Sequence, residues 1–262
     1  MPRASRVSAR ALLFLFALSL LATPGLRAAG PVQADLPTLI KETQKMSQEN
    51  HKMILVWWIP EDFWRISFAN SGTTTAEQEE SILAILRPYL LVGVVDGSIG
   101  PLGGMTYRSE AETRKLLVVL DRTGREYRPT AEDQVSGDLR NLLGMMKPML
   151  ANMLGPMGEN FRFYVFPAKD DSGKPLADPK SEGKVGIRLG EESFEWRLPL
   201  GSLLPAKMCP QDKEMLNGAW TYCPWHGAKL VEAPAQVVDR SRKLEHHLEA
   251  FEHRVSGEGA RG

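Results

Sequence analysis

Two short segments of the sequence repeat a cysteine, a proline and a second possible metal ligand at the same spacing. The only two cysteines of the chain, Cys209 and Cys223, are each followed directly by proline. Three residues after each cysteine stands another side chain that can bind a metal, Asp212 after the first and His226 after the second. Thiolate, imidazole and, less often, carboxylate are the ligands of four-coordinate zinc sites in proteins. The sequence therefore predicts a zinc site at Cys209, Asp212, Cys223 and His226.

The residues around these ligands are typical of two tight turns with a hairpin between them. Proline after each cysteine fixes φ at a value that suits a turn. Gly227 follows His226 at a place where a left-handed residue can redirect the chain. Between the two turns, Asn217-Gly218 predicts a further turn, and residues 220–222 are expected to form a short strand.

This arrangement resembles a degenerate zinc-ribbon module over residues 208–230, and the resemblance does not extend to the rest of the chain. The usual zinc-ribbon pattern has a cysteine where this chain has Asp212, and here no glycine follows that residue. The resemblance implies a small zinc-ribbon-like hairpin over residues 205–230, with a structural metal whose four positions are all filled by side chains.

A disulfide between Cys209 and Cys223 is the alternative to a metal site. Paired cysteines in an oxidising compartment usually bond to each other. Closing a loop of this length would stabilise the fold by about 3 kcal/mol. The two hypotheses exclude each other, because a sulfur atom in a disulfide cannot act as a metal ligand. Zinc is thus the expected cofactor, and the alternative is no cofactor.

The N-terminal residues 1–29 have the features of a secretory signal peptide. Residues 1–10 are basic, residues 11–22 are apolar, and small residues at Ala28 and Ala29 offer a cleavage site. The apolar segment is too short to span a membrane. We therefore expect a periplasmic or secreted protein, in a bacterium, with no membrane span after cleavage of the signal.

Charge and composition argue against a nucleic-acid partner. The formal net charge of the 262 residues is zero, and the first thirty contain four arginines and no acidic residue. The remainder therefore has 28 basic and 32 acidic residues, a net charge of −4. Such a chain lacks the positive patch that binds nucleic acid. A protein partner in the cell envelope is the expectation.

Alternating apolar runs and helical patterns predict an α+β domain over residues 31–200, with a mixed sheet and flanking helices. Strands are expected at 53–59, 89–95, 105–107, 161–166, 184–189 and 193–198, with a hairpin over 116–128. Helices are expected over 33–50, from a capping box at Thr74 or Thr75 to Pro88, and over 136–155. Residues 236–262 are expected to form a terminal helix, over 237–254, and a disordered tail. No internal repeat is expected.

Three further groups of residues could carry chemistry. Methionines at 145, 149, 153 and 157 would form one stripe on a helix, which suits either Cu(I) binding or a core or partner surface. Pro148 and Gly155 are expected to interrupt that stripe. Glu61 and Asp62 follow a predicted strand and could be a catalytic pair or cap the next turn. On the terminal helix, a face with His246, Glu249 and His253 could bind a metal or simply be solvated.

Common catalytic motifs are missing. The chain has no G-x-S-x-G, no H-E-x-x-H and no Walker lysine. The sequence thus favours a non-enzymatic, exported envelope protein in which a zinc-ribbon-like module supports the docking of a partner. Two alternatives stay open: a zinc-dependent hydrolase with an open Cys2His site, and a Cu(I)-handling periplasmic protein that uses the methionine stripe.

Overall fold

The described part of the chain combines helices with antiparallel sheets, which confirms the α+β class. The structure is a computed structural model, and it describes residues 35–47, 49 and 51–233. The signal peptide expected at 1–29 and the helix and tail expected at 236–262 lie outside these residues. Within the described residues, no helix is both long enough and apolar enough to cross a membrane.

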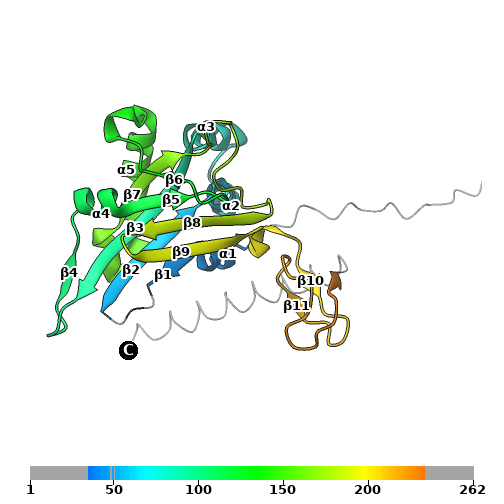
Figure 1. Cartoon of the computed structure of the whole chain (residues 1–262). Helices are drawn as coiled ribbons and strands as arrows, with labels where there is room; N and C mark the ends of the chain where they lie inside the picture. Colours follow the sequence, from blue (N-terminus) through cyan, green and yellow to red (C-terminus); the bar gives the residue numbers. More distant parts are fainter. Residues whose placement is uncertain (1–34, 48, 50, 234–262) are drawn as a thin grey trace, which may run out of the picture. The chain divides into compact units, whose positions relative to one another are not determined.

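Five strands form the larger sheet, in the order β1-β2-β3-β4, with β7 also paired to β3 (Figure 1). They are β1 (Gln44–Met46), β2 (Lys52–Ile59), β3 (Tyr89–Ile99), β4 (Met105–Tyr107) and β7 (Arg162–Pro167). The long apolar runs predicted as central strands are β2 and β3, and nearly all of their residues are buried. The strand predicted over 89–95 is longer than expected: Asp96 and Gly97 continue β3 and pair with Ile54 and Met53 of β2.

Four strands form the second sheet, in the order β6-β5-β8-β9. They are β5 (Leu117–Leu120), β6 (Glu126–Tyr127), β8 (Gly183–Leu189) and β9 (Glu192–Leu198). Both predicted hairpins, β5-β6 and β8-β9, are confirmed. Val185, Ile187 and Leu189 are buried on one face of β8, as the alternation of the sequence predicts.

All pairings among the described strands are antiparallel, so the mixed sheet that we expected is not found. The reason lies in the connection between β2 and β3. Two helices join these strands, and the chain enters β3 at the end where β2 finishes, with Ile59 opposite Leu91. A parallel pair would need a crossover that returns the chain to the opposite end of the sheet.

Four of the five described α-helices begin at a residue whose side chain caps the helix, whereas α2 follows Pro60 and has no side-chain cap. They are α1 (Leu36–Thr43), α2 (Glu61–Ser71), α3 (Ala76–Leu86), α4 (Glu110–Leu116) and α5 (Gly137–Met153), with 3-10 helices η1 (Glu132–Gln134), η2 (Gly155–Asn160) and η3 (Gly201–Leu203). The predicted capping box at Thr75 starts α3. A second one, between Ser109 and Glu112, starts α4, a helix that was not expected from the sequence.

The helix expected over residues 33–50 is wrong in its second half. It ends at Thr43, and the next three residues form β1, where Gln44 pairs with Trp57 of β2. The polar pattern of this segment also fits an edge strand, and pairing with the buried strand decides between the two. Thr43 supports the junction, because its buried hydroxyl accepts a hydrogen bond from Trp57 Nε1 at 3.1 Å.

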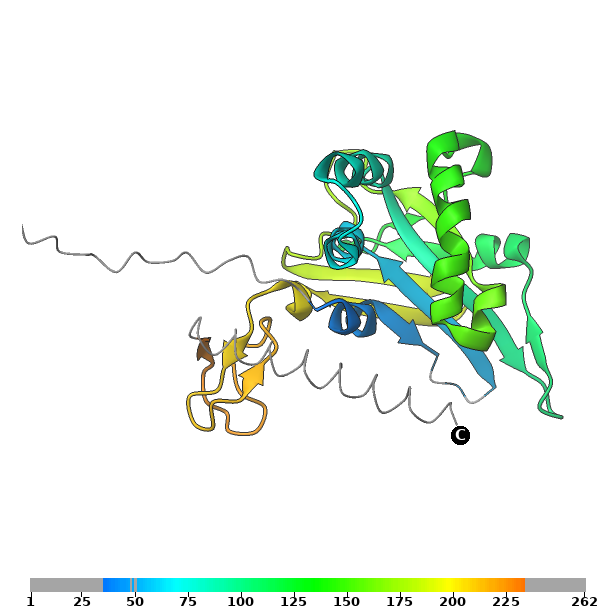
Figure 2. The same ribbon diagram turned by 180° about the vertical axis from the view of Figure 1, so that it is seen from behind.

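The two sheets and α5 form successive layers. The four-stranded sheet lies in front of the five-stranded sheet in Figure 1, and α5 lies in front of the other face of the five-stranded sheet in Figure 2. One apolar core therefore runs on both sides of β2 and β3. Packing is close at Gly93, where a Cβ atom would overlap the ring of Phe161.

A third, small sheet holds the predicted zinc-ribbon-like segment. Its strands are β10 (Lys207–Met208), β11 (Met215–Leu216) and β12 (Val231–Glu232), in the order β11-β10-β12. It has its own buried cluster, which consists of Cys209, Leu216, Cys223 and Leu230. This module is the part of the described chain where the predicted ligands lie.

Candidate metal centre

The first ligand-bearing turn runs from Cys209 to Glu214 and is closed by two backbone hydrogen bonds. The N–H of Cys209 donates to the carbonyl oxygen of Glu214 at 2.9 Å, and the N–H of Lys213 donates to the carbonyl oxygen of Cys209 at 3.0 Å. Lys213 has a φ of 68°, in the left-handed region. These bonds turn the chain back so that the side chains of Cys209 and Asp212 come from the same loop.

The second turn, from Cys223 to Ala228, has the same hydrogen bonds. The N–H of Cys223 donates to the carbonyl oxygen of Ala228 at 2.8 Å, and the N–H of Gly227 donates to that of Cys223 at 2.9 Å. Gly227 has a φ of 63°, as its place in the sequence predicts. Each residue of this turn lies fourteen positions after its equivalent in the first turn, so His226 is the equivalent of Asp212.

The equivalence extends beyond the turns and reveals an internal repeat, although none was expected from the sequence. Leu216 and Leu230 are also fourteen residues apart, and with the two cysteines they make up the buried cluster of the module. The shared sequence is C-P-x5-L, in which x5 is any five residues. The repeated cysteine and proline are visible in the sequence, and the structure adds the equivalence of the two turns and of the two buried leucines.

Three of the four predicted ligands come together. The ligand atoms of Cys209, Cys223 and His226 all lie within 4.8 Å of one another. His226 Nδ1 is 3.4 Å from the sulfur of Cys209 and 3.5 Å from that of Cys223. Zinc–sulfur bonds of about 2.3 Å and zinc–nitrogen bonds of about 2.0 Å at a tetrahedral angle place the two ligand atoms about 3.5 Å apart. The distances therefore fit one shared tetrahedral ion.

Asp212, the fourth predicted ligand, lies beside this group but is not one of its three members. Its Oδ2 is 3.6 Å from His226 Nδ1, and its Oδ1 accepts a hydrogen bond from the N–H of Glu214 at 3.1 Å. That hydrogen bond, with one from the Cys209 side chain, lowers the pKa of the Asp212 carboxyl. The carboxylate therefore points toward the imidazole of His226 and the sulfur of Cys209. Asp212 has the same place in the first turn as His226 has in the second.

Both sulfur atoms are buried and receive backbone hydrogen bonds. The N–H groups of Asp212 and Gln211 donate to Cys209, and those of His226 and Trp225 donate to Cys223. Burial raises the pKa of the Cys209 thiol. Burial also opposes ionisation of Cys223, but the donors around it together lower the pKa of that thiol. Such donors stabilise a thiolate, which is the form that binds a metal.

The structure describes Cys209 and Cys223 as free thiols. His226 Nδ1 lies within 3.5 Å of both sulfur atoms, so a nitrogen ligand faces the pair. The disulfide alternative would leave this imidazole without a role. The group is therefore compatible with a metal site.

The methionine stripe is not continuous. Met145, Met149 and Met153 are exposed on α5, whereas Met157 lies in η2 and packs against the apolar core. The predicted interruption at Gly155 is confirmed. The one predicted at Pro148 is wrong, because α5 continues through this proline.

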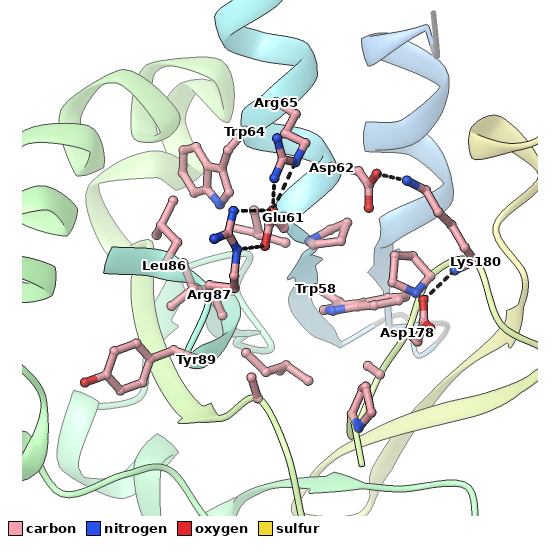
Figure 3. A pocket seen from close by; sticks show the side chains of 18 of the residues that line it. Trp58, Glu61, Asp62, Trp64, Arg65, Leu86, Arg87, Tyr89, Asp178 and Lys180 are labelled. Carbon is pink, nitrogen blue, oxygen red and sulfur yellow. Dashed lines mark hydrogen bonds and ion pairs between the residues drawn. The ribbon is translucent and has the colours of Figure 1, made fainter. Parts of the chain in front are cut away.

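Glu61 and Asp62 lie in a pocket of about 320 Å³ between α2 and neighbouring loops (Figure 3). They form the first turn of α2, where negative charge is favourable. Glu61 is held by Arg65 at 2.6 Å and by Arg87 at 3.2 Å, and Asp62 is held by Lys180 at 2.7 Å. Neither carboxylate caps α2, because its N-cap residue is Pro60 and no side chain makes a capping hydrogen bond there. Both carboxylates are engaged in ion pairs, which favours a structural role over a catalytic pair.

Comparisons with family models, with curated proteins and with solved structures find no match for this chain. The chemistry of the metal centre therefore has to follow from its own geometry.

Proposed function

We propose that residues 205–230 are a structural zinc module that supports partner docking in an exported, non-enzymatic protein of the bacterial envelope. The observation that carries this proposal is the meeting of Cys209, Cys223 and His226, from two turns with the same hydrogen bonds, at distances that fit one ion. Two thiolates and an imidazole are ligands that suit zinc. Asp212 completes the site as the fourth ligand, from the position equivalent to that of His226.

A structural role for the ion follows from the size of the module. Its separate buried cluster has four residues, and two of them are the cysteines. Segments below about 40 residues usually need a metal or a disulfide to fold, because their apolar core is too small. With all four positions filled by side chains, the ion has no place for a reacting water. The metal would then hold the two turns together.

The docking role rests on the aromatic side chains around the second turn. Trp220, Tyr222 and Trp225 are 44%, 58% and 72% exposed. Large aromatic residues on a rigid support are enriched at the centres of protein interfaces. A zinc-stabilised turn would hold them in place before a partner arrives, which lowers the entropy lost on binding.

The first experiment measures bound metal and free thiols on one sample. The protein is purified from the periplasm without chelator or reductant, bound metal is measured by elemental analysis, and thiols are counted after denaturation. One zinc per chain with two free thiols is the expected result. No metal and no free thiol would contradict the proposal and establish the disulfide.

A second experiment tests the docking role separately. The single substitution Trp225→Ala removes an exposed ring without touching a ligand side chain, so zinc content should stay at one per chain. Capture of an envelope partner by crosslinking should fall relative to the wild-type protein. Tyr127→Ala, which alters a half-buried ring on β6, is the matched control and should leave capture unchanged. Equal capture by wild type and Trp225→Ala would contradict the docking role.

A further inference from the structure

A second site lies in the α+β domain, far in sequence from the metal centre. Residues of α4, η1, α5 and β7 line a pocket of about 320 Å³. In Figure 2, α5 crosses the face of the larger sheet. Residues of α5 and β7 line the pocket together with residues of α4 and η1. Its volume is at the lower end of the range for pockets that bind small molecules.

Positive charge is in excess in this pocket. It is lined by four cationic side chains and two carboxylates, namely Arg114, Arg140, Lys147, Arg162, Glu110 and Glu132. Two ion pairs join these groups: Arg114 to Glu132 at 3.2 Å, and Arg162 to Glu110 at 3.6 Å. Four cations less two carboxylates leave a formal charge of +2 on the lining.

Backbone carbonyl oxygens orient two of the guanidinium groups. Arg140 Nη1 donates to the carbonyl oxygens of Glu132 and Val135, both at 2.8 Å. Arg162 Nη1 donates in the same way to the carbonyl oxygens of Glu159 and Phe161, at 2.7 and 2.9 Å. A carbonyl oxygen fixes the orientation of a guanidinium without neutralising it. The charge of Arg162 is shared with Glu110, whereas Arg140 makes no ion pair within the described residues and keeps its full positive charge. The pocket is thus preorganised for an anion.

Lys147 is the side chain of this pocket that most favours an anionic ligand. Within the part of the chain that the structure describes, its ammonium group makes no hydrogen bond and no ion pair. Burial lowers the pKa of this ammonium, and the positive charge of the nearby Arg162 lowers this pKa further. The carboxylate of Glu110 raises the pKa, but by less than Arg162 lowers it. A partly buried cation without a counter-ion is costly, and a bound anion would remove that cost.

The floor of the pocket is apolar. Val135, Leu143 and Val165 are buried there, and the ring of Phe163 also lines the wall. We propose that this pocket binds a small organic oxyanion, a carboxylate or phosphate ester, whose apolar part lies on this floor and whose charged group meets Lys147 and Arg140. Such binding would be independent of the zinc module.

The test uses phenyl phosphate as the probe, because it combines an oxyanion with a ring. Binding to the full-length protein is followed by the NMR shifts of backbone amides. Benzyl alcohol, which has the ring without the charge, and inorganic phosphate, which has the charge without the ring, are the two reference probes. We expect phenyl phosphate to shift the amides of α5 and β7, with an affinity at least about tenfold above that of either reference.

Lys147→Met keeps most of the aliphatic stem and removes the charge. We expect it to weaken phenyl phosphate binding about tenfold or more. Lys41→Met, which alters an exposed lysine of α1, is the matched control and should bind like the wild type. Since the ammonium is partly buried, Lys147→Met should keep the native amide spectrum elsewhere. Unchanged binding by Lys147→Met would overturn the proposal.

Gly144 provides a steric test at the same pocket. It lines the pocket, and a Cβ atom added there meets no atom within 4 Å. Gly144→Ala and Gly144→Leu should both fold, because alanine and leucine favour a helix more than glycine does. Gly144→Leu should block phenyl phosphate, whereas Gly144→Ala should bind it. Equal binding by both variants, or no shift of α5 and β7 with any probe, would also overturn the proposal.

Discussion

The α+β domain and the zinc-ribbon-like module reach a folded state by different means. In the domain, one apolar core runs on both sides of β2 and β3, and rings such as those of Trp57 and Phe161 are fully buried. In the module, the buried cluster has four residues, and two of these are the candidate ligands. Burial of apolar surface can stabilise the first region, whereas under the proposed function the second depends on a bond between its two turns.

This difference also separates the two kinds of site. In the proposed anion pocket of the domain, backbone carbonyl oxygens orient charged groups such as that of Arg140. In the module, the ligands and the scaffold are largely the same residues, because Cys209 and Cys223 are both core and site. A change at the metal centre should therefore unfold its surroundings, and a change at the pocket should not.

The largest effect is expected from removing a cysteine ligand. Structural zinc contributes roughly 10–16 kcal/mol to the folding of small zinc domains. Cys223→Ser should therefore abolish zinc binding and unfold the module, while β2 and β3 stay folded. NMR spectra of the variant, with zinc analysis, measure both effects. A variant that keeps zinc and the native amide signals of the module would contradict this prediction.

A core substitution in the domain should give the opposite result. Phe161 is fully buried, and its ring lies against Gly93 and 6.2 Å from that of Trp57. Phe161→Ala should cost about 3–5 kcal/mol of domain stability, because it leaves a cavity. Urea unfolding measures this loss, and zinc content should stay at one per chain. Loss of zinc from the folded variant would show that the two regions are not independent.

The two non-cysteine ligands should differ in effect. His226 Nδ1 lies within 3.6 Å of a ligand atom from each of the other three predicted ligands, whereas Asp212 lies at the edge of the group. Loss of a residue that only supports a ligand lowers metal affinity about 10- to 100-fold, so Asp212→Asn should lower zinc affinity by at least that much. His226→Gln should lower it further. Competition with a chelator measures both affinities. An unchanged affinity in Asp212→Asn would mean that a water fills the fourth position, as in the hydrolase alternative.

The smallest effect concerns the conformation of the first turn. Lys213 has a left-handed conformation, which costs a non-glycine residue about 1–2 kcal/mol. Lys213→Gly should remove this cost and make the first turn more like the second, with a stabilisation of about 1 kcal/mol. The substitution also removes the hydrogen bond from Lys213 Nζ to the carbonyl oxygen of Pro210, and this loss offsets part of the stabilisation. Amide exchange of the module measures the change, and faster exchange would contradict the prediction.

Much of the domain could be predicted because its local patterns agree with its tertiary structure. The apolar run at 53–59, the capping box at Thr75 and the alternation over 184–198 are all confirmed as elements. The helix predicted over 33–50 is wrong where pairing with β2 overrides local preference. The capping box at Ser109 was present in the sequence, but the helix after it has only seven residues, too short for a clear periodic pattern.

The two candidate sites differ in how far the sequence reveals them. The ligands of the metal centre lie within eighteen residues and share a spacing, so their residue types were sufficient to predict them. The cations of the anion pocket come from Arg114, Arg140, Lys147 and Arg162, which lie on three separate elements. No spacing links them, and only the packing of α5 on the sheet brings them together.

The central claim is that a metal holds the module, whereas apolar burial holds the domain. Hydrogen exchange on the protein as purified, with and without a zinc chelator, tests this claim most directly. We expect the chelator to abolish protection of the backbone amides between Lys207 and Leu230 and to leave those of β2 and β3 protected. Unchanged protection of the module after removal of the metal would contradict the claim.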